Sequence, residues 1–105
     1  AMLLGDEQGR VALANAQAAA LFEVGQTDEL LGLDLPRLLG EFSPVQALDW
    51  GAALAALRPD GPALTVEARL GAGEWLLQVA AVEMLGQPRL IVSIADLSPV
   101  RAAER

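Results

Sequence analysis

The chain contains no cysteine, histidine, tyrosine or lysine, and each of these absences removes a class of functional site. Without cysteine there is no disulfide framework, no thiolate nucleophile and no metal held by sulfur. Without histidine there is no imidazole base, no histidine-ligated haem or zinc and no phospho-accepting imidazole. Without lysine there is no Schiff base and no P-loop lysine. We therefore expect a domain that is not an enzyme and that holds no metal.

Basic charge is also scarce. Fourteen acidic residues face seven basic ones, all of them arginines spread singly along the chain, and the net charge is −7. Nucleic acid is a poor partner for such a chain, because neutralising phosphates requires clustered Lys and Arg. No apolar run approaches the roughly 18 residues of a membrane span, and the first residues lack the basic stretch of a signal peptide. We expect a cytoplasmic domain without direct membrane insertion, and we leave open whether the parent protein is anchored.

The 105 residues correspond to one domain, and a hydrophobic content of 53% argues against intrinsic disorder. Aromatic residues make up only 4% of the chain. Most of the core must therefore come from leucine and alanine.

The first half of the chain reads as a β-hairpin followed by four short helices. The expected strands are residues 2–4 and 10–15, and the expected helices are residues 16–23, 27–32, 33–39 and 44–58. We expect Asn15, Thr27 and Ser43 to cap helix starts and Gly25 to stop the first helix. Pro44 follows Ser43 at the favoured first helical position.

In the second half of the chain the hydrophobic period changes from 3.6 residues to 2. Strands are expected at residues 64–70, 74–85 and 89–95, joined by glycine-containing turns. A short helix is expected to follow at residues 100–105. Helices grouped between sets of antiparallel strands indicate the α+β class rather than alternating βαβ units.

Four local motifs, in this order, resemble the PAS domain, a sensory module of bacterial signalling proteins. They are an acidic-glycine turn into a strand (residues 6–11), an Asn-led helix start (residues 15–22), the Asp-Glu-Leu-Leu-Gly helix (residues 28–32) and the exit that begins Ile-Ala-Asp-Leu-Ser-Pro (residues 94–105). The resemblance covers essentially the whole chain. It implies a five-stranded antiparallel sheet with several short helices packed on one face.

The resemblance also implies an organisation and a role. Residues 1–98 would be the sensor domain, and residues 99–105 would begin a linker helix to a missing output domain. That output would be a histidine kinase of a two-component system, or a diguanylate cyclase or phosphodiesterase. In the family the exit helix usually continues as a coiled coil, so we expect a homodimer in which the two copies lie near each other.

The cofactors known for the family do not suit this composition. Haem-binding relatives use a side-chain ligand to iron, usually histidine, and the blue-light flavin class forms its adduct on a cysteine; this chain has neither residue. We therefore expect no cofactor. Two alternatives stay open: a sensor that binds a small apolar ligand, and a ligand-free module for dimerisation or protein interaction.

A ligand would lie between the sheet and the helices. The resemblance points Ile94, and with it Leu90 and Val92, toward the helices, and it places Trp75 one residue before the inward set of its strand. The candidate pocket residues are Phe22, Leu31, Leu39, Trp50, Leu76, Gln78, Leu90, Val92 and Ile94. Gln78 would bond local backbone or water or contact a ligand, and a register error of one residue would place it in solvent.

The opposite face of the same strand would then carry an apolar stripe of Trp75, Leu77 and Val79. We expect it to be a dimer interface or the docking surface of a flanking helix, since exposed apolar patches usually mark contacts. The alternative is that this stripe is the true core. Asp96 and Ser98 are expected to anchor the exit helix, and a signal would be relayed through the same anchor.

Overall fold

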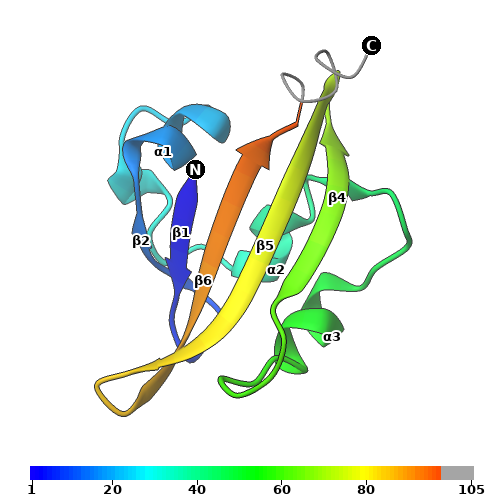
Figure 1. Ribbon diagram of the computed structural model, residues 1–105. Helices are drawn as coiled ribbons and strands as arrows, with labels where there is room; N and C mark the ends of the chain where they lie inside the picture. Colours follow the sequence, from blue (N-terminus) through cyan, green and yellow to red (C-terminus); the bar gives the residue numbers. More distant parts are fainter. Residues whose placement is uncertain (98–105) are drawn as a thin grey trace.

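The computed structural model describes residues 1–97 of the chain (Figure 1). The strands are β1 (Met2–Gly5), β2 (Val11–Ala14), β3 (Ser43–Pro44), β4 (Leu64–Leu70), β5 (Gly73–Met84) and β6 (Gln87–Asp96). The helices are α1 (Ala16–Leu21), the 3-10 helix η1 (Thr27–Glu29), α2 (Leu35–Leu39) and α3 (Trp50–Ala55). The expected helix at residues 100–105 lies outside the described residues.

One antiparallel sheet contains all the strands, in the order β2-β1-β6-β5-β4-β3. The expected α+β class is confirmed, with six strands instead of five. The first and last described strands are neighbours at the middle of the sheet, where Met2 lies opposite Ser93. The helices gather on one side of the sheet, which buries that face.

The additional strand, β3, corrects the expected start of the longest helix. Ser43 and Pro44 lie opposite Arg69 and Ala68 at the edge of the sheet, so they do not begin a helix. The backbone N–H of Val45 donates to the carbonyl of Glu67 in β4. Neighbouring residues of a strand point their N–H groups in opposite directions, so position 44 would point its N–H away from β4. A proline there therefore costs no hydrogen bond between the strands. Helix α3 begins six residues later, where the side chain of Asp49 accepts from the N–H of Ala52.

One of the other expected helix boundaries is confirmed, and two differ in detail. Asn15 caps α1 as predicted, since its Oδ1 accepts from the N–H groups of Ala18 at 2.9 Å and Met2 at 3.1 Å. The helix ends at Leu21 with Phe22 as its C-cap, and the left-handed residue that follows is Glu23, with a φ of 58°, and not Gly25. Thr27 lies inside η1, whose N-cap is Gln26 in a reciprocal capping box with Glu29.

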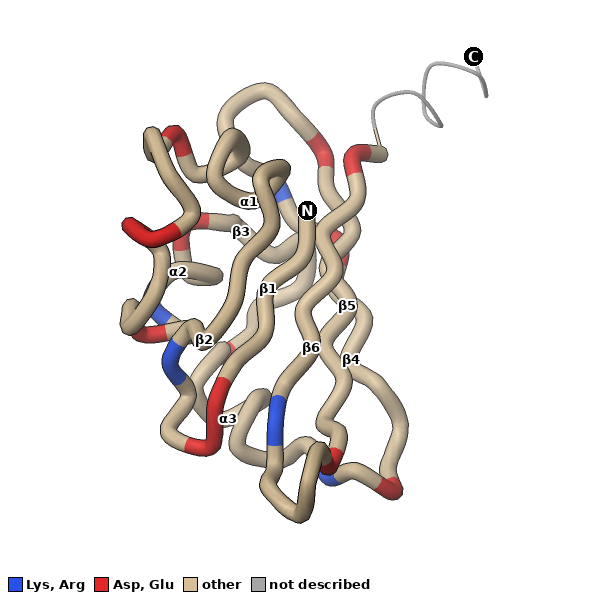
Figure 2. The backbone as a smooth tube through the Cα atoms, turned by 90° about the vertical axis from the view of Figure 1, so that its left-hand side faces the viewer, with Lys and Arg blue, Asp and Glu red and all other residues tan. Residues whose placement is uncertain are grey.

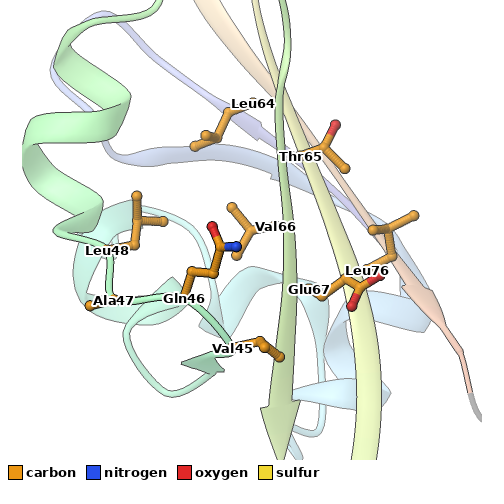
Figure 3. A pocket seen from close by; sticks show the side chains of 9 residues that line it. All are labelled: Val45, Gln46, Ala47, Leu48, Leu64, Thr65, Val66, Glu67 and Leu76. Carbon is orange, nitrogen blue, oxygen red and sulfur yellow. The ribbon is translucent and has the colours of Figure 1, made fainter.

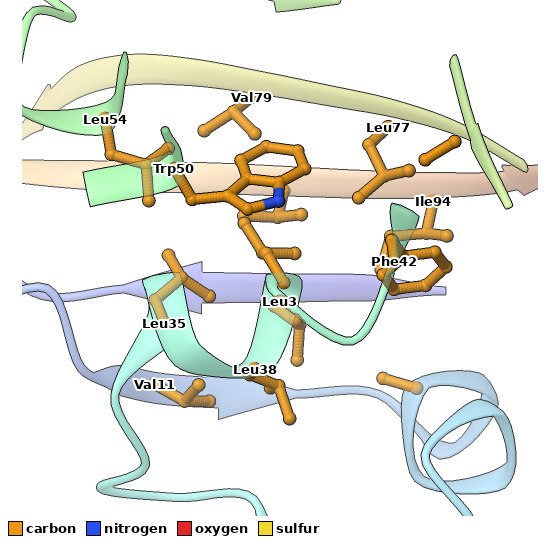
Figure 4. Packing of buried hydrophobic residues seen from close by; sticks show 14 of the residues in the cluster. Leu3, Val11, Leu35, Leu38, Phe42, Trp50, Leu54, Leu77, Val79 and Ile94 are labelled. Carbon is orange, nitrogen blue, oxygen red and sulfur yellow. The ribbon is translucent and has the colours of Figure 1, made fainter. Parts of the chain in front are cut away.

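The core lies between the sheet and the helices, and leucine supplies much of it (Figure 4). Trp50 and Leu54 form the buried stripe of α3, as their helical spacing predicts, and Leu57 packs against it half-buried. Phe42 contacts two other aromatic rings edge to face. The distance between ring centroids is 6.1 Å to Phe22 and 6.4 Å to Trp75.

The register of β5 is one residue away from the one expected. Leu77 lies opposite Ile94 and Val79 opposite Val92, and residues directly opposite each other in an antiparallel pair share a face. Leu77 and Val79 are completely buried. The side chains that face the helices are therefore those of Trp75, Leu77 and Val79, while Gln78 is exposed on the other face.

The β5–β6 hairpin has a two-residue turn whose central residues, Leu85 and Gly86, both adopt positive φ, 52° and 76°. This is the type I′ pattern, for which Asn-Gly is the preferred pair.

Leu85 is fully exposed and has no packing to lose. We expect Leu85→Asn to raise the free energy of unfolding by about 1 kcal/mol, because Asn tolerates the left-handed conformation that Leu resists. Urea denaturation measures the gain, and Gly86→Ala should change stability in the opposite direction.

Candidate functional site

The predicted pocket residues divide between the two faces of the sheet. Those that meet in the space between the sheet and the helices are Phe22, Leu39, Trp50, Leu90, Val92 and Ile94. Leu31 is 42% exposed and stands apart from them. Leu76 and Gln78 lie on the outer face, so their inward placement was wrong.

The error arose because both faces of β5 carry apolar residues. Leu76, Ala80 and Val82 alternate with Leu77, Val79 and Ala81, so a period of two does not separate inside from outside. The amide of Gln78 was the feature of the sequence that indicated which face of β5 is exposed, because a polar side chain favours the solvated face.

The interior that was expected to hold a ligand is occupied by the protein's own side chains. Leu39 and Val92 are fully buried, and Trp50 is only 6% exposed. The indole Nε1 atoms of Trp50 and Trp75 are buried without a hydrogen-bond partner in the described part of the chain. The space between sheet and helices therefore offers tight apolar packing and two unused donors.

A cleft opens where this interior ends, close to the β5–β6 hairpin. We call it the end cleft; its volume is about 410 Å³. It is lined by the turn of residues 6–9, by Pro36, by Gly51, Leu54, Ala55 and residues 57–59 of α3 and its exit, by Ala81 of β5 and by residues 88–90 of β6. This volume falls within the roughly 300–1,000 Å³ typical of ligand sites.

Small residues keep the end cleft open. Gly51 and Ala55 line it from α3, and Ala81 lines it from β5, opposite Leu90. A Cβ atom added at Gly51 would meet only Oδ1 of Asp49, at 3.5 Å. Side chains of ordinary size at these positions would fill the space.

Two arginines line the end cleft, and their hydrogen bonds go to uncharged acceptors. Arg58 Nη1 donates to the carbonyl oxygens of Ala55 and Leu57, both at 2.9 Å. Arg89 donates from Nη1 to the carbonyl of Pro88 at 2.9 Å and from Nη2 to Oε1 of Gln87 at 2.6 Å. The arginine positions of the described residues lie scattered along the backbone (Figure 2).

Asp6 is the acidic counterpart in the end cleft. Its Oδ1 accepts from the N–H groups of Arg10 at 3.0 Å and Gln8 at 2.9 Å. The pKa of Asp6 is held below its usual value of 3.8. The largest cause is the hydrogen bond from the Arg10 N–H, and the Gln8 bond and the charges of Arg89 and Arg10 act in the same direction. Desolvation of the carboxyl group opposes them.

This lowered pKa predicts a pH dependence of stability. A carboxyl group whose pKa is lower in the folded state stabilises the fold above its unfolded pKa of about 3.9, and the stabilisation disappears as pH falls through the folded value. Asp6→Asn should therefore be less stable than the parent chain at pH 7, and the difference should shrink below pH ~3.9. Urea denaturation at both pH values measures it. The control is Glu7→Gln, which removes the same charge from the neighbouring residue. An equal pH-dependent loss of stability in that variant would contradict the assignment of the effect to the Asp6 carboxyl group.

A second hollow, the edge groove, lies where β3 separates from β4 (Figure 3). Its volume is about 420 Å³, and residues 45–48 form one wall while residues 64–67 and Leu76 form the other. The N–H of Val45 donates to the carbonyl of Glu67 at 2.9 Å. Beyond that bond, no strand of the described part of the chain covers the edge of β4 at residues 64–66.

The predicted interface stripe is not on the surface. Leu77 and Val79 are core residues and Trp75 packs on Phe42, so their assignment to an exposed contact surface was wrong. The outer face has a different apolar set, which we call the outer row: Leu13, Leu4, Ile91 and Ala80. These four lie directly opposite one another across β2, β1, β6 and β5.

The predicted relay residues lie where β6 ends. Asp96 is exposed and pairs with Trp75 across the sheet. Ser98 lies outside the described residues. Pairing continues past β6, because the N–H of Leu97 donates to the carbonyl of Glu74 at 2.9 Å. At the same end, Ala1 and Ile94 exchange hydrogen bonds of 3.0 and 2.9 Å, so the first described residue lies beside the end of β6.

Two kinds of feature are absent from residues 1–97. No helix there is long and apolar enough to cross a membrane. No group of three or more acidic side chains in that range is arranged to hold a metal ion.

No protein-family model and no curated protein matches the sequence, whereas solved structures do match. The PAS domain of an HTR-like protein from Haloarcula marismortui superposes with a TM-score of 0.65 at 15% identity, over 90% of this chain and 78% of that one. The sensor region of a sensor histidine kinase superposes with a TM-score of 0.67 at 20% identity, over 95% of this chain and 40% of that one. Likeness at such low identity across nearly all of the chain establishes its architecture: this chain has a PAS-like fold.

Proposed function

We propose that this chain is a non-catalytic sensory module of a cytoplasmic signalling protein. It would pass a signal through β6 and the segment that follows to an output domain, either a histidine kinase or a diguanylate cyclase or phosphodiesterase. The PAS-like fold supports this role. One of the similar structures is the sensor region of a sensor histidine kinase, and this chain spans 40% of that structure.

The observation that carries the proposal is the course of β6. The strand lines the end cleft near its start with Arg89 and Leu90, passes through the core with Val92 and Ile94, and ends at Asp96. It is paired with β5 along its whole length and with β1 over residues 90–93. A displacement at the cleft would therefore be carried by a single paired strand to the point where the chain leaves the sheet.

Deletion of residues 1–97 from the full-length parent protein tests this role. We expect the output activity to change, either released from inhibition or lost, while the output domain stays folded. Arg69→Gln, an exposed change on β4, is the matched control and should leave the output unchanged. An output activity that is the same with and without the domain would refute the proposal.

A second candidate function is a ligand-free dimerisation module, which the filled interior and the outer row favour. In that case Ile91→Glu should shift the protein toward monomer in sedimentation equilibrium with little loss of stability. Thr65→Glu adds the same charge to the outer face on β4, away from the row, and should leave the oligomeric state unchanged. A parent chain that is already monomeric would exclude dimerisation through this face.

A further inference from the structure

We propose that the tip of the β5–β6 hairpin docks into the end cleft of a second copy of this chain. Two copies exchange their hairpins, so that Leu85 of each lies in the cleft of the other. This contact is separate from the outer row. It goes beyond the proposed sensory role and does not depend on it.

The hairpin projects beyond the rest of the sheet (Figure 1). β4 pairs with β5 only as far as Val79, and β1 pairs with β6 only over residues 90–93. Residues 82–89, which we call the arm, therefore pair only with each other in the described part of the chain. Residues 83–88 are all exposed. The outer part of the arm is thus free to contact another molecule.

The tip of the arm carries the most exposed large hydrophobic residue of residues 1–97. Leu85 is 104% exposed, against 62% for Leu13, which comes next. Leu85 also adopts a φ of 52°, a conformation that leucine resists. Both features are unfavourable for the isolated fold, and departures of this kind concentrate at functional sites. Leu85 therefore serves a contact outside its own chain, together with Met84, which is 46% exposed beside it.

The end cleft has room for such a side chain. Gly51 and Ala55 of α3 and Ala81 of β5 leave its volume of about 410 Å³ open, and Leu54 and Leu90 line it with aliphatic surface. A leucine that enters from outside is removed from water, and the burial of apolar surface favours association.

The charges of the cleft and of the tip are compatible. The cleft is lined by two carboxylates, those of Asp6 and Glu7, and by two guanidinium groups, those of Arg58 and Arg89, so its formal charges cancel. Residues 84–87 at the tip are uncharged. A neutral apolar tip therefore meets a neutral cleft. This matters because the whole chain carries a net charge of −7, and contacts between acidic surfaces of two copies would be repulsive.

The spacing of tip and cleft along the arm lets two copies fit each other. Ala81 lines the cleft four residues before Leu85, a separation of about 14 Å along an extended strand. Two arms that lie side by side and antiparallel bring each tip to the base of the other arm, so both contacts form together. Such an interface is isologous and closes with two copies. Glu83, midway along the arm, then lies nearest the two-fold axis.

The first experiment measures the oligomeric state of the 105-residue chain by sedimentation equilibrium over a series of concentrations. We expect a dimer, and Leu85→Asn should raise its Kd roughly 100-fold or more, because each of two leucines loses a contact worth about ten-fold. In dilute solution, where both chains are monomeric, the same variant should be more stable than the parent, so weaker association would not reflect a damaged fold. A parent chain that stays monomeric up to about 1 mM, or an unchanged Kd for Leu85→Asn, would overturn the proposal.

A mixing experiment tests whether the tip enters the cleft. Gly51→Leu fills the cleft from an exposed helical position and should also prevent dimerisation. The Leu85→Asn variant keeps an open cleft and the Gly51→Leu variant keeps an intact tip, so one of the two contacts can form between them. The mixture should therefore associate more tightly than either variant alone. If the mixture stays as monomeric as its components, the tip does not dock into the cleft.

Two further variants separate this arrangement from other dimers. Leu13→Glu changes the outer row on β2, two strands away from β6, and should leave the Kd unchanged. Dimer loss in Leu13→Glu with none in Leu85→Asn would assign the interface to the outer row. Glu83→Gln should strengthen the dimer, because it removes two like charges near the two-fold axis; a weaker dimer would contradict the antiparallel arms. The deletion test of the sensory role is independent of all these results.

Discussion

Leu77→Glu is expected to abolish cooperative folding of the chain. Leu77 is completely buried opposite Ile94, between the sheet and the helices. The variant would lose the packing of a core leucine, worth about 2–5 kcal/mol, and would add the further cost of an unpaired buried carboxylate. Together these losses approach the whole stability of a typical domain, about 5–15 kcal/mol. Circular dichroism and urea denaturation should show no folded baseline near neutral pH.

The matched control is the next residue of the same strand. Gln78→Glu introduces the same charge on the exposed outer face, and surface changes of this kind usually alter stability by less than about 0.5 kcal/mol. A folded Leu77→Glu variant beside an unfolded Gln78→Glu variant would mean that the register of β5 is the opposite one.

Trp50→Ala is expected to lower the free energy of unfolding by about 3–5 kcal/mol, the usual cost of removing a large aromatic side chain from a core. Trp50 is the first residue of α3 and packs in the middle of the buried cluster (Figure 4). Urea denaturation measures the loss as a lower midpoint with an unchanged slope.

The informative comparison is Trp50→Phe. The indole N–H of Trp50 has no acceptor in the described part of the chain, and an unpaired buried donor costs on the order of 1–3 kcal/mol. Phenylalanine removes that donor together with part of the ring, so the two effects oppose each other. We expect Trp50→Phe to stay within about 1.5 kcal/mol of the parent chain. A loss as large as that of Trp50→Ala would show that the N–H is satisfied.

Local chemistry made much of the secondary structure predictable. The cap at Asn15, the period-two pattern of residues 64–70 and the glycine turns each depend on neighbouring residues, and the structure has all of them. Ser43-Pro44 was misleading because the same dipeptide suits a helix start and an edge strand. Only its partner at Ala68 and Arg69, more than twenty positions along the chain, decides between the two.

The candidate site was less predictable, since it depends on distant segments. The end cleft joins the turn of residues 6–9, the exit of α3 and the β5–β6 hairpin. No spacing within one segment marks Gly51, Ala55 and Ala81 as neighbours of one cavity. Their small side chains were visible in the sequence, but nothing local showed that they face the same space.

By itself, the sequence determined the composition limits, the α+β class and the resemblance to PAS domains, because residue types and local periodicity determine these. The tertiary structure decided which face of β5 is buried. Both faces of that strand are apolar, and only its pairing with β6, where Leu77 meets Ile94 and Val79 meets Val92, turns one of them toward the helices. With that pairing the protein's own side chains pack in the interior, and the open space lies at the end of the sheet. Which face of a strand is buried depends on the strands it pairs with and not on its own sequence alone.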